Sequence, residues 1–164
     1  MIQGDENRVR KTLTVKASAA VAWRVFTAQI GTWWPLADYT IGTSRAVDAV
    51  IEPRVGGRWY ERGEDGSTCA WGTVLTWEPT SRLVLTWDIG ADWKYDPNLG
   101  TEIEIHFTAE GDRRTRVDLE HRRLDRYGLH RDRMRAVFDK EGDWGRLLAR
   151  MAEAAEADAG GETP

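Results

Sequence analysis

Four segments of this chain alternate apolar and polar side chains with a period of two residues. This is the pattern of a strand that buries one of its faces. The segments are residues 8–16, 82–89, 101–108 and 115–122. In segment 82–89, for example, Leu83, Leu85 and Trp87 share one face. Because an apolar sheet face must be covered by another layer, the pattern restricts the fold to a sheet with a cover on one side.

Three further strands are predicted between the first and second of these segments, at 46–52, 58–62 and 69–78. Pro53, Gly56-Gly57 and the turn at 64–67 separate them. Gly72 lies inside a predicted strand, where a glycine marks a bulge or sharp bend that lets a sheet curl. Seven strands joined mostly by short turns imply an antiparallel meander.

The helical signals lie after the first strand and at the end of the chain. Ser18 is a suitable N-cap for a helix that runs to about Gln29, and Pro35 ends a second short helical piece that carries Trp33 and Trp34. Apolar residues at helical spacing predict one long amphipathic helix from about Arg131 to Ala157. Gly142 and Gly145 lower its local propensity and indicate a bend or a close approach.

The order of the elements indicates an α+β fold. A curved antiparallel sheet of about seven strands wraps around the long C-terminal helix, and two short helices follow the first strand. Residues 1–157 are expected to form a single domain and residues 158–164 a flexible tail. Only the C-terminal helix is long enough to cover the sheet, so the space between the two layers is filled with aromatic rings or left as a cavity.

Composition excludes several classes of protein. The net charge is −4 and the arginines of 113–135 are interrupted by acids, which argues against binding to nucleic acid. Cys69 is the single cysteine, so neither an intrachain disulfide nor a site of several thiolates is possible. The N-terminus lacks a signal-peptide core, and no apolar run reaches the roughly 18 residues of a membrane helix. We therefore expect a cytoplasmic protein without a membrane partner.

Three segments of the first half identify a family. Trp33-Trp34-Pro35, the run from Gly56 to Glu61 and the run from Trp71 to Pro79 occur in this order and spacing. With them, the chain resembles the Hsp90-ATPase-activator-homologue-like branch of the START-like superfamily, also called SRPBCC or Bet v 1-like. The resemblance covers about Val9 to Ala155 and implies the helix-grip fold, in which related proteins hold apolar ligands between sheet and helix. It implies less about activity, because the superfamily includes lipid carriers, cyclases, hydrolases and co-chaperone domains.

Nine tryptophans are unusual for a soluble chain of this length, and such rings complete a core, line a cavity or anchor an interface. The rings of helix, strands and loop converge at one end of the predicted fold, which favours a cavity. Its predicted ligand-binding residues are Trp33, Trp34, Tyr60, Trp71, Trp87, Trp93, His121 and Phe138. The alternative is that each ring simply fills the core, and we assign Trp23 and Trp144 to core packing.

His121 is the best titratable candidate, since it shares the inward parity of Val117 and Leu119. It would accept a proton or bind a ligand hydroxyl, or else be a satisfied histidine without chemistry. The other histidines, His106 and His130, are interpreted as surface residues. Glu61 is either a carboxylate at the cavity mouth or, as we favour, a solvated strand residue. No ligand cluster for a metal is visible, and no cofactor is expected.

Three functions remain open. The first is binding of a small hydrophobic or aromatic molecule in the cavity. The second is a small-molecule enzyme of cyclase or hydrolase type, with His121 as acid or base and Tyr60 or Glu61 assisting. The third is an interaction module that binds the chaperone Hsp90, which the family name suggests.

Overall fold

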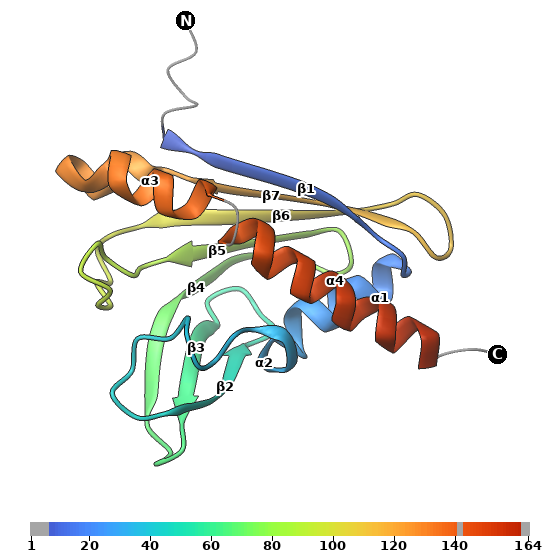
Figure 1. Ribbon diagram of the computed structural model, residues 1–164, viewed down its shortest axis with the longest axis horizontal. Coiled ribbons are helices and arrows are strands. Elements are labelled where there is room, and N and C mark those ends of the chain that lie inside the picture. Colours follow the sequence, from blue (N-terminus) through green and yellow to red (C-terminus); the bar gives the residue numbers. More distant parts are fainter. Residues whose placement is uncertain (1–6, 141–142, 162–164) are drawn as a thin grey trace, which may run out of the picture.

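The computed structural model describes residues 7–140 and 143–161 as a seven-stranded antiparallel sheet with helices against one face (Figure 1). The sheet order is β1-β7-β6-β5-β4-β3-β2. The strands are β1 (Val9–Val15), β2 (Ala46–Ile51), β3 (Arg58–Gly63), β4 (Thr68–Glu78), β5 (Arg82–Trp87), β6 (Thr101–Ala109) and β7 (Thr115–Arg122). The helices are α1 (Ala19–Thr27), α2 (Ile30–Trp33), the 3₁₀ segment η2 (Leu124–His130), α3 (Arg131–Asp139) and α4 (Trp144–Gly161). The predicted helix-grip architecture is confirmed.

The sheet curls at the glycine that the sequence marked. In the pairing of β3 with β4, Trp59 lies opposite Gly72 but Tyr60 lies opposite Ala70, so Trp71 is an extra residue in the ladder. A Cβ atom at Gly72 would lie 1.9 Å from the carbonyl oxygen of Thr86 on β5. Glycine is therefore required by the close approach of two backbones, and the bulge bends the sheet as expected.

The first helix begins as predicted. The Ser18 side chain accepts a hydrogen bond of 3.1 Å from the backbone N–H of Val21, which caps α1. Helix α1 packs against α4 and against β6, so the two helices together cover one half of the sheet. Arg24 and Asp158 form an ion pair that joins the two helices near their far ends.

The C-terminal region differs from the prediction of one continuous helix. Helix α3 ends at Asp139, where Lys140 adopts an extended conformation with ψ of 153°, and α4 begins at Trp144. The break follows from local chemistry, because a Gly-Asp sequence has low helix propensity and aspartate favours the position before a helix. Gly142 itself lies outside the described residues. Helix α4 continues to Gly161, so part of the expected tail is helical, and residues 162–164 lie outside the described range.

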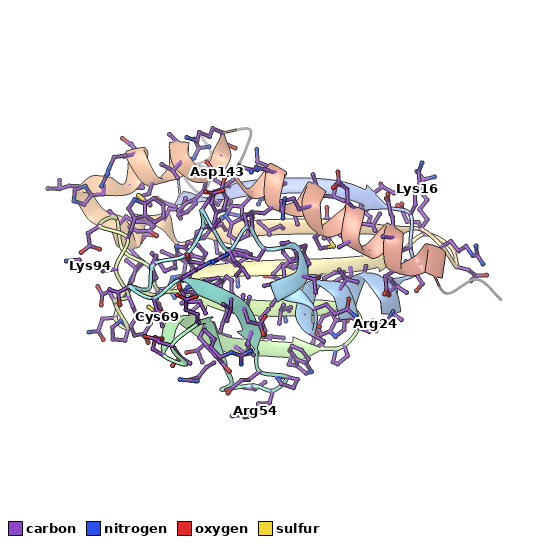
Figure 2. The ribbon with its side chains drawn as sticks, turned by 60° about the horizontal axis from the view of Figure 1, so that its bottom comes forward. Lys16, Arg24, Arg54, Cys69, Lys94 and Asp143 are labelled. Carbon is purple, nitrogen blue, oxygen red and sulfur yellow. The ribbon has the colours of Figure 1, made fainter. Side chains whose placement is uncertain are left out.

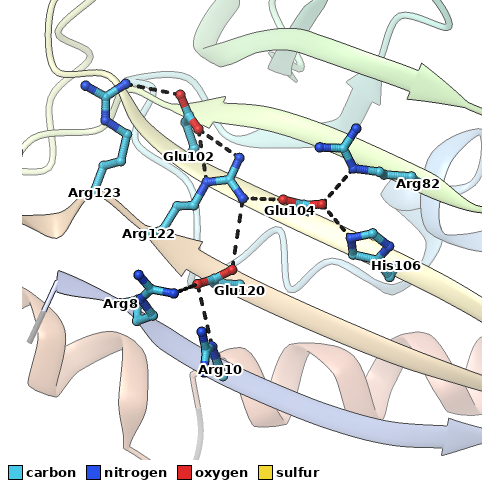
Figure 3. A network of polar contacts seen from close by, with 9 residues as sticks. All are labelled: Arg8, Arg10, Arg82, Glu102, Glu104, His106, Glu120, Arg122 and Arg123. Carbon is cyan, nitrogen blue, oxygen red and sulfur yellow. Dashed lines mark hydrogen bonds and ion pairs between the residues drawn. The ribbon is translucent and has the colours of Figure 1, made fainter. Parts of the chain in front are cut away.

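The outer face of the sheet carries an ionic network instead of a second layer (Figure 3). Glu104 at its centre contacts Arg82 at 2.7 Å, Arg122 and His106. Burial raises the pKa of the Glu104 carboxyl, but hydrogen bonds from these three partners outweigh it and hold the pKa at about 2. The network therefore holds together β5, β6 and β7 on the side that faces away from the helices. His106 lies there, half-exposed, as the alternation predicts.

No helix among the described residues is both long and apolar enough to cross a membrane.

Candidate functional site

A pocket of about 670 Å³ opens where the break between α3 and α4 meets the end of β5. Its walls come from the loop after α2, the end of β5 with the following loop, the last turn of α3 and the first turn of α4. The lining residues are Trp34, Asp38, Tyr39, Thr40, Ile41, Trp87, Ile89, Trp93, Val137, Phe138, Lys140, Asp143, Trp144, Arg146 and Leu147. The volume falls in the range of small-molecule sites.

Aromatic rings in mutual contact form the inner wall of the pocket. The ring of Trp87 lies 5.8 Å from that of Phe138 and 5.8 Å from that of Trp144, both nearly perpendicular to it. Trp34 reaches Trp144 across the pocket floor at 6.2 Å. These are the edge-to-face arrangements that aromatic pairs prefer, so the wall is a packed array whose four residues are only 2–7% exposed.

His121 lies directly behind this wall and is fully buried. Its Nδ1 atom accepts a hydrogen bond of 3.1 Å from the indole N–H of Trp144. Its Nε2 atom lies 3.0 Å from the hydroxyl of Thr101, which itself donates to the carbonyl of Trp87. Burial lowers the pKa of His121 to about 3, so the ring is neutral at physiological pH, with the proton on Nε2.

This arrangement gives His121 a positioning role in the pocket wall. Both ring nitrogens are engaged, and its ring centroid lies 4.3 Å from that of Phe138. The inward direction predicted from strand parity is correct, but His121 does not line the pocket. It has no free lone pair toward a ligand, so a general-base role would require that Trp144 first move away.

Glu61 holds the loop that forms the outer wall. The carboxylate is buried, which corrects the interpretation of a solvated strand residue. It accepts hydrogen bonds from the backbone N–H groups of Ile41 (2.7 Å) and Gly42 (3.1 Å) and from the indole of Trp71 (2.8 Å). A buried carboxylate with three donors is a strong anchor, because its loss would leave all three donors unpaired. Glu61 thus fixes the loop that carries Tyr39 and Ile41.

Charged residues gather at the rim of the pocket. Asp38, Lys140 and Arg146 are exposed, whereas Asp143 is half-buried. The Arg146 guanidinium lies 5.6 Å from the centre of the Tyr39 ring, a cation–π contact between α4 and the outer loop. Burial raises the pKa of the Asp143 carboxyl, and the nearby charges of Lys140 and Arg146 partly oppose this shift.

The structure brings together only part of the predicted set. Trp34, Trp87, Trp93 and Phe138 line the pocket. The other members of the set are Trp33, Tyr60, Trp71 and His121, and none of them does so.

The predicted residues that do not line the pocket lie either in the core or on the other face of the sheet. Trp33 is buried beside Phe26, and its indole donates to the carbonyl of Val25. Trp71 lies behind Trp34, at 4.9 Å between ring centroids. Tyr60 points to the other face of β3, where the guanidinium of Arg58 stacks on its ring. The parity shared by Arg58, Tyr60 and Arg62 was the sequence signal for that direction.

Several lining residues were missed. Trp144 was assigned to core packing, yet it is both buried and part of the pocket wall. Tyr39 and Ile41 lie in a loop without periodicity, so no local pattern could place them. Leu147 and Val137 belong to the apolar stripes of α4 and α3, and they reach the pocket because the helix is interrupted between them.

Metal and thiol chemistry receive no support from the described part of the chain. Within residues 7–140 and 143–161, no three His, Cys, Asp or Glu side chains lie close enough to hold a metal ion. Burial and the charge of Glu61 both raise the pKa of the Cys69 thiol, which disfavours the reactive thiolate.

Solved structures support the fold and relate the chain to two named proteins. It is 35% identical to an anthrahydroquino-gama-pyrone synthase, Txn09, with a TM-score of 0.63, and the match covers 90% of this chain and 97% of the other. It is 28% identical to CalC from Micromonospora echinospora, a self-sacrificing resistance protein, with a TM-score of 0.71 and coverage of 94% and 97%.

A more distant relative shares the fold alone. A protein from Nitrosomonas europaea has 14% identity and a TM-score of 0.64, with coverage of 96% and 99%. Comparison with curated proteins yields no match. The family described as Activator of Hsp90 ATPase homolog 1-like protein matches residues 16–156. The chain therefore belongs to this family, within the SRPBCC superfamily of helix-grip proteins.

Proposed function

We propose that the protein binds a small, flat aromatic molecule in the pocket between β5, the outer loop and the break of α3 and α4. The observation that carries this proposal is the pocket of about 670 Å³ with four contiguous aromatic residues on its inner side. Trp34, Trp87, Phe138 and Trp144 form a packed aromatic wall. The more exposed rings of Trp93 and Tyr39 offer surface on which another ring can stack. An apolar ligand would gain by removing this surface from water.

The walls are fixed before any ligand arrives, which lowers the cost of binding. The indole of Trp144 is held by His121 and that of Trp34 donates to the carbonyl of Tyr39 at 2.9 Å. The outer loop is tied to Glu61 through two backbone N–H groups. A wall held by hydrogen bonds from behind keeps its shape, so the site favours ligands of matching width.

The name of one relative supports an aromatic ligand. Txn09 is named as a synthase of an anthrahydroquino-gama-pyrone, which is a fused-ring compound. A fused ring system of about three rings would fit within the pocket volume of this chain. We propose the same class of ligand for this chain but not the same reaction, because His121 is not placed as a base here.

The test is titration of the purified protein with anthraquinone, phenanthrene and a saturated fatty acid of similar volume. We expect saturable quenching of tryptophan fluorescence and a higher melting temperature with the two aromatic compounds. The fatty acid should produce a much smaller response, because it cannot stack on the rings. Absence of any saturable response from both aromatic compounds would refute the proposal.

A matched pair of variants locates the site. Val137→Phe adds a ring on α3 at the pocket lining, and we expect affinity for the aromatic compounds to fall at least about tenfold, because the new ring occupies their space. Val55→Phe makes the same change at a residue that is 65% exposed and lies outside the pocket lining. Equal affinities in the two variants would place the binding site elsewhere.

The family description also suggests Hsp90 as a partner, and this is the competing proposal. It predicts that the protein co-precipitates with purified Hsp90 and that Val137→Phe leaves this association unchanged. Association with Hsp90 without binding of any aromatic compound would favour the competing proposal.

A further inference from the structure

Among the described residues, Asp143 is the acid of the pocket lining that carries a buried oxygen without a hydrogen-bond partner. It immediately precedes Trp144 at the start of α4 and lies beside the gap between α3 and α4 (Figure 2). Its Oδ2 atom is buried and has no hydrogen-bond partner among the described residues. Two other buried side-chain atoms among the described residues lack a partner, the indole nitrogens of Trp59 and Trp87. Asp143 is therefore the one carboxylate of this kind in the described chain.

The other acid of the pocket differs from Asp143 in its surroundings. Asp38 is exposed, so water satisfies its carboxylate, and a ligand group that replaced this water would gain little. Glu61 is buried but already accepts from three donors. The Oδ2 atom of Asp143 is buried and has no donor among the described residues, and burial raises the pKa of its carboxyl. A donor supplied from the pocket would therefore be bound most strongly at Asp143.

The chemistry of the side chain defines that donor. An ionised carboxylate only accepts hydrogen bonds, and the terminal torsion of aspartate is soft, so either oxygen can turn toward the pocket. Lys140 and Arg146 lie near enough to influence Asp143 electrostatically, but neither donates to its Oδ2 atom. A ligand group that pairs with this carboxylate must be a donor, and a phenolic hydroxyl is a donor that an aromatic ring can carry.

Resting on the proposed function, we propose that Asp143 is a specificity-determining residue that accepts a hydrogen bond from a hydroxyl group on the aromatic ligand. The rings of Trp87, Phe138 and Trp144 contact the ring system of the ligand, and Asp143 accepts a hydrogen bond from the hydroxyl group at the edge of the ligand. The ligand class is accordingly a hydroxylated fused aromatic rather than a plain hydrocarbon or an ether. An ether oxygen cannot donate, so it would leave the carboxylate unpaired.

The experiment compares hydroxyphenanthrenes with their methyl ethers, which keep the ring system and the oxygen, add a methyl group and lose the donor. Isothermal calorimetry at neutral pH measures both affinities. We expect wild-type protein to bind the best hydroxyl isomer about tenfold more tightly than its methyl ether, the effect of one hydrogen bond to a charged group. Asp143→Ala should abolish this preference while still binding the methyl ether, and Asp143→Asn should retain a small part of it.

Two further variants separate Asp143 from its neighbours. Asp139→Asn changes a carboxylate of α3 outside the pocket lining and should keep the full preference. Asp38→Asn changes the other acid of the lining, and loss of the preference there instead of in the Asp143 variants would overturn the assignment. Far-ultraviolet circular dichroism and the melting temperature of each variant confirm that it is folded.

The outcomes distinguish this inference from the proposed function. If wild-type protein binds hydroxyl compounds and ethers equally, the role of Asp143 is wrong and the aromatic site stands. If a preference exists but survives in folded Asp143→Ala, the role of Asp143 is also wrong. If the protein binds neither class of compound, the proposed function fails, and the inference fails with it.

Discussion

Aromatic rings gather at both ends of the space between sheet and helices, yet one end is solid and the other is hollow. At the end covered by α1, Trp23 contacts Trp77 at 5.0 Å and Phe107 at 5.4 Å, and Phe26 contacts Phe107 at 5.8 Å. None of these four rings lines the pocket described above. At the other end, rings at similar spacings border a pocket of about 670 Å³.

The difference lies in what covers the rings. Helices α1 and α4 pack against each other and close the solid end. At the hollow end the cover is interrupted between Asp139 and Trp144, and a loop held by Glu61 stands in place of a helix. Aromatic content therefore does not distinguish a core from a cavity, because a cavity depends on whether the opposing layer reaches the rings.

The largest expected effect comes from a matched pair of phenylalanines that are both 4% exposed, Phe107 at the solid end and Phe138 at the hollow end. Phe107→Ala should lower the free energy of unfolding by about 3–5 kcal/mol, because it leaves a void among close-packed rings. Phe138→Ala should cost about 2 kcal/mol less, since one side of that ring already borders the pocket. Urea denaturation measures both, and equal losses would contradict the distinction between the two ends.

The anchor of the outer loop provides the next test. Glu61→Gln replaces one acceptor oxygen by an amide donor, so one of the three N–H groups loses its partner. We expect a loss of about 2 kcal/mol in unfolding free energy. Hydrogen exchange at the Ile41 and Gly42 amides should accelerate, while amides of α1 at the solid end keep their protection. The exposed Glu64 serves as control, and unchanged exchange in Glu61→Gln would show that Glu61 does not hold the loop.

The third test uses the pH dependence of His121. Its pKa of about 3 in the folded protein lies below the ordinary value of 6.5, so between these values the unfolded state binds a proton that the native state excludes. The stabilising contribution is complete above pH 6.5 and is lost as the pH falls from 6.5 toward 3. The slope approaches about 1 kcal/mol per pH unit.

The measurement is urea unfolding of wild type and His121→Gln between pH 6.5 and pH 4.5. Near pH 4.5 the lowered pKa of Glu104 adds to the slope equally in both proteins. The raised pKa values of Asp88 and Asp143 act in the opposite direction and are common to both proteins. The slope should be smaller in His121→Gln, and identical slopes would contradict a buried neutral His121. The ligand affinity of the wild type should not change around pH 6.5, where a free histidine titrates.

The smallest effect is expected outside both ends, in the ionic network of Figure 3. Glu104→Gln removes the shared partner of Arg82, Arg122 and His106. Because these partners are partly exposed, we expect a loss of about 1 kcal/mol that shrinks in high salt. Aromatic ligand affinity should stay unchanged, and a large change would mean that the outer face is coupled to the pocket.

The sequence by itself determined the faces of the strands and the order of the elements. Alternation placed Leu83, Leu85 and His121 inward and His106 outward, and Ser18 fixed the start of α1. Gly72 marked the bulge correctly. These features are local, because the period of an element decides which way each side chain points and a cap or bulge needs only its own neighbours.

Tertiary structure alone decided which inward residues meet a cavity. Trp33 and Trp34 are adjacent in sequence, yet one is buried against α1 and the other lines the pocket. Glu61 anchors the outer loop because that loop, distant in sequence, supplies its hydrogen-bond donors. Trp144 lines the pocket because the helix is interrupted just before it. A repeating sequence pattern predicts only which way a side chain points from its own helix or strand. The distance to the opposing layer depends on contacts between segments far apart in the chain, and that distance separates a packed core from a binding site.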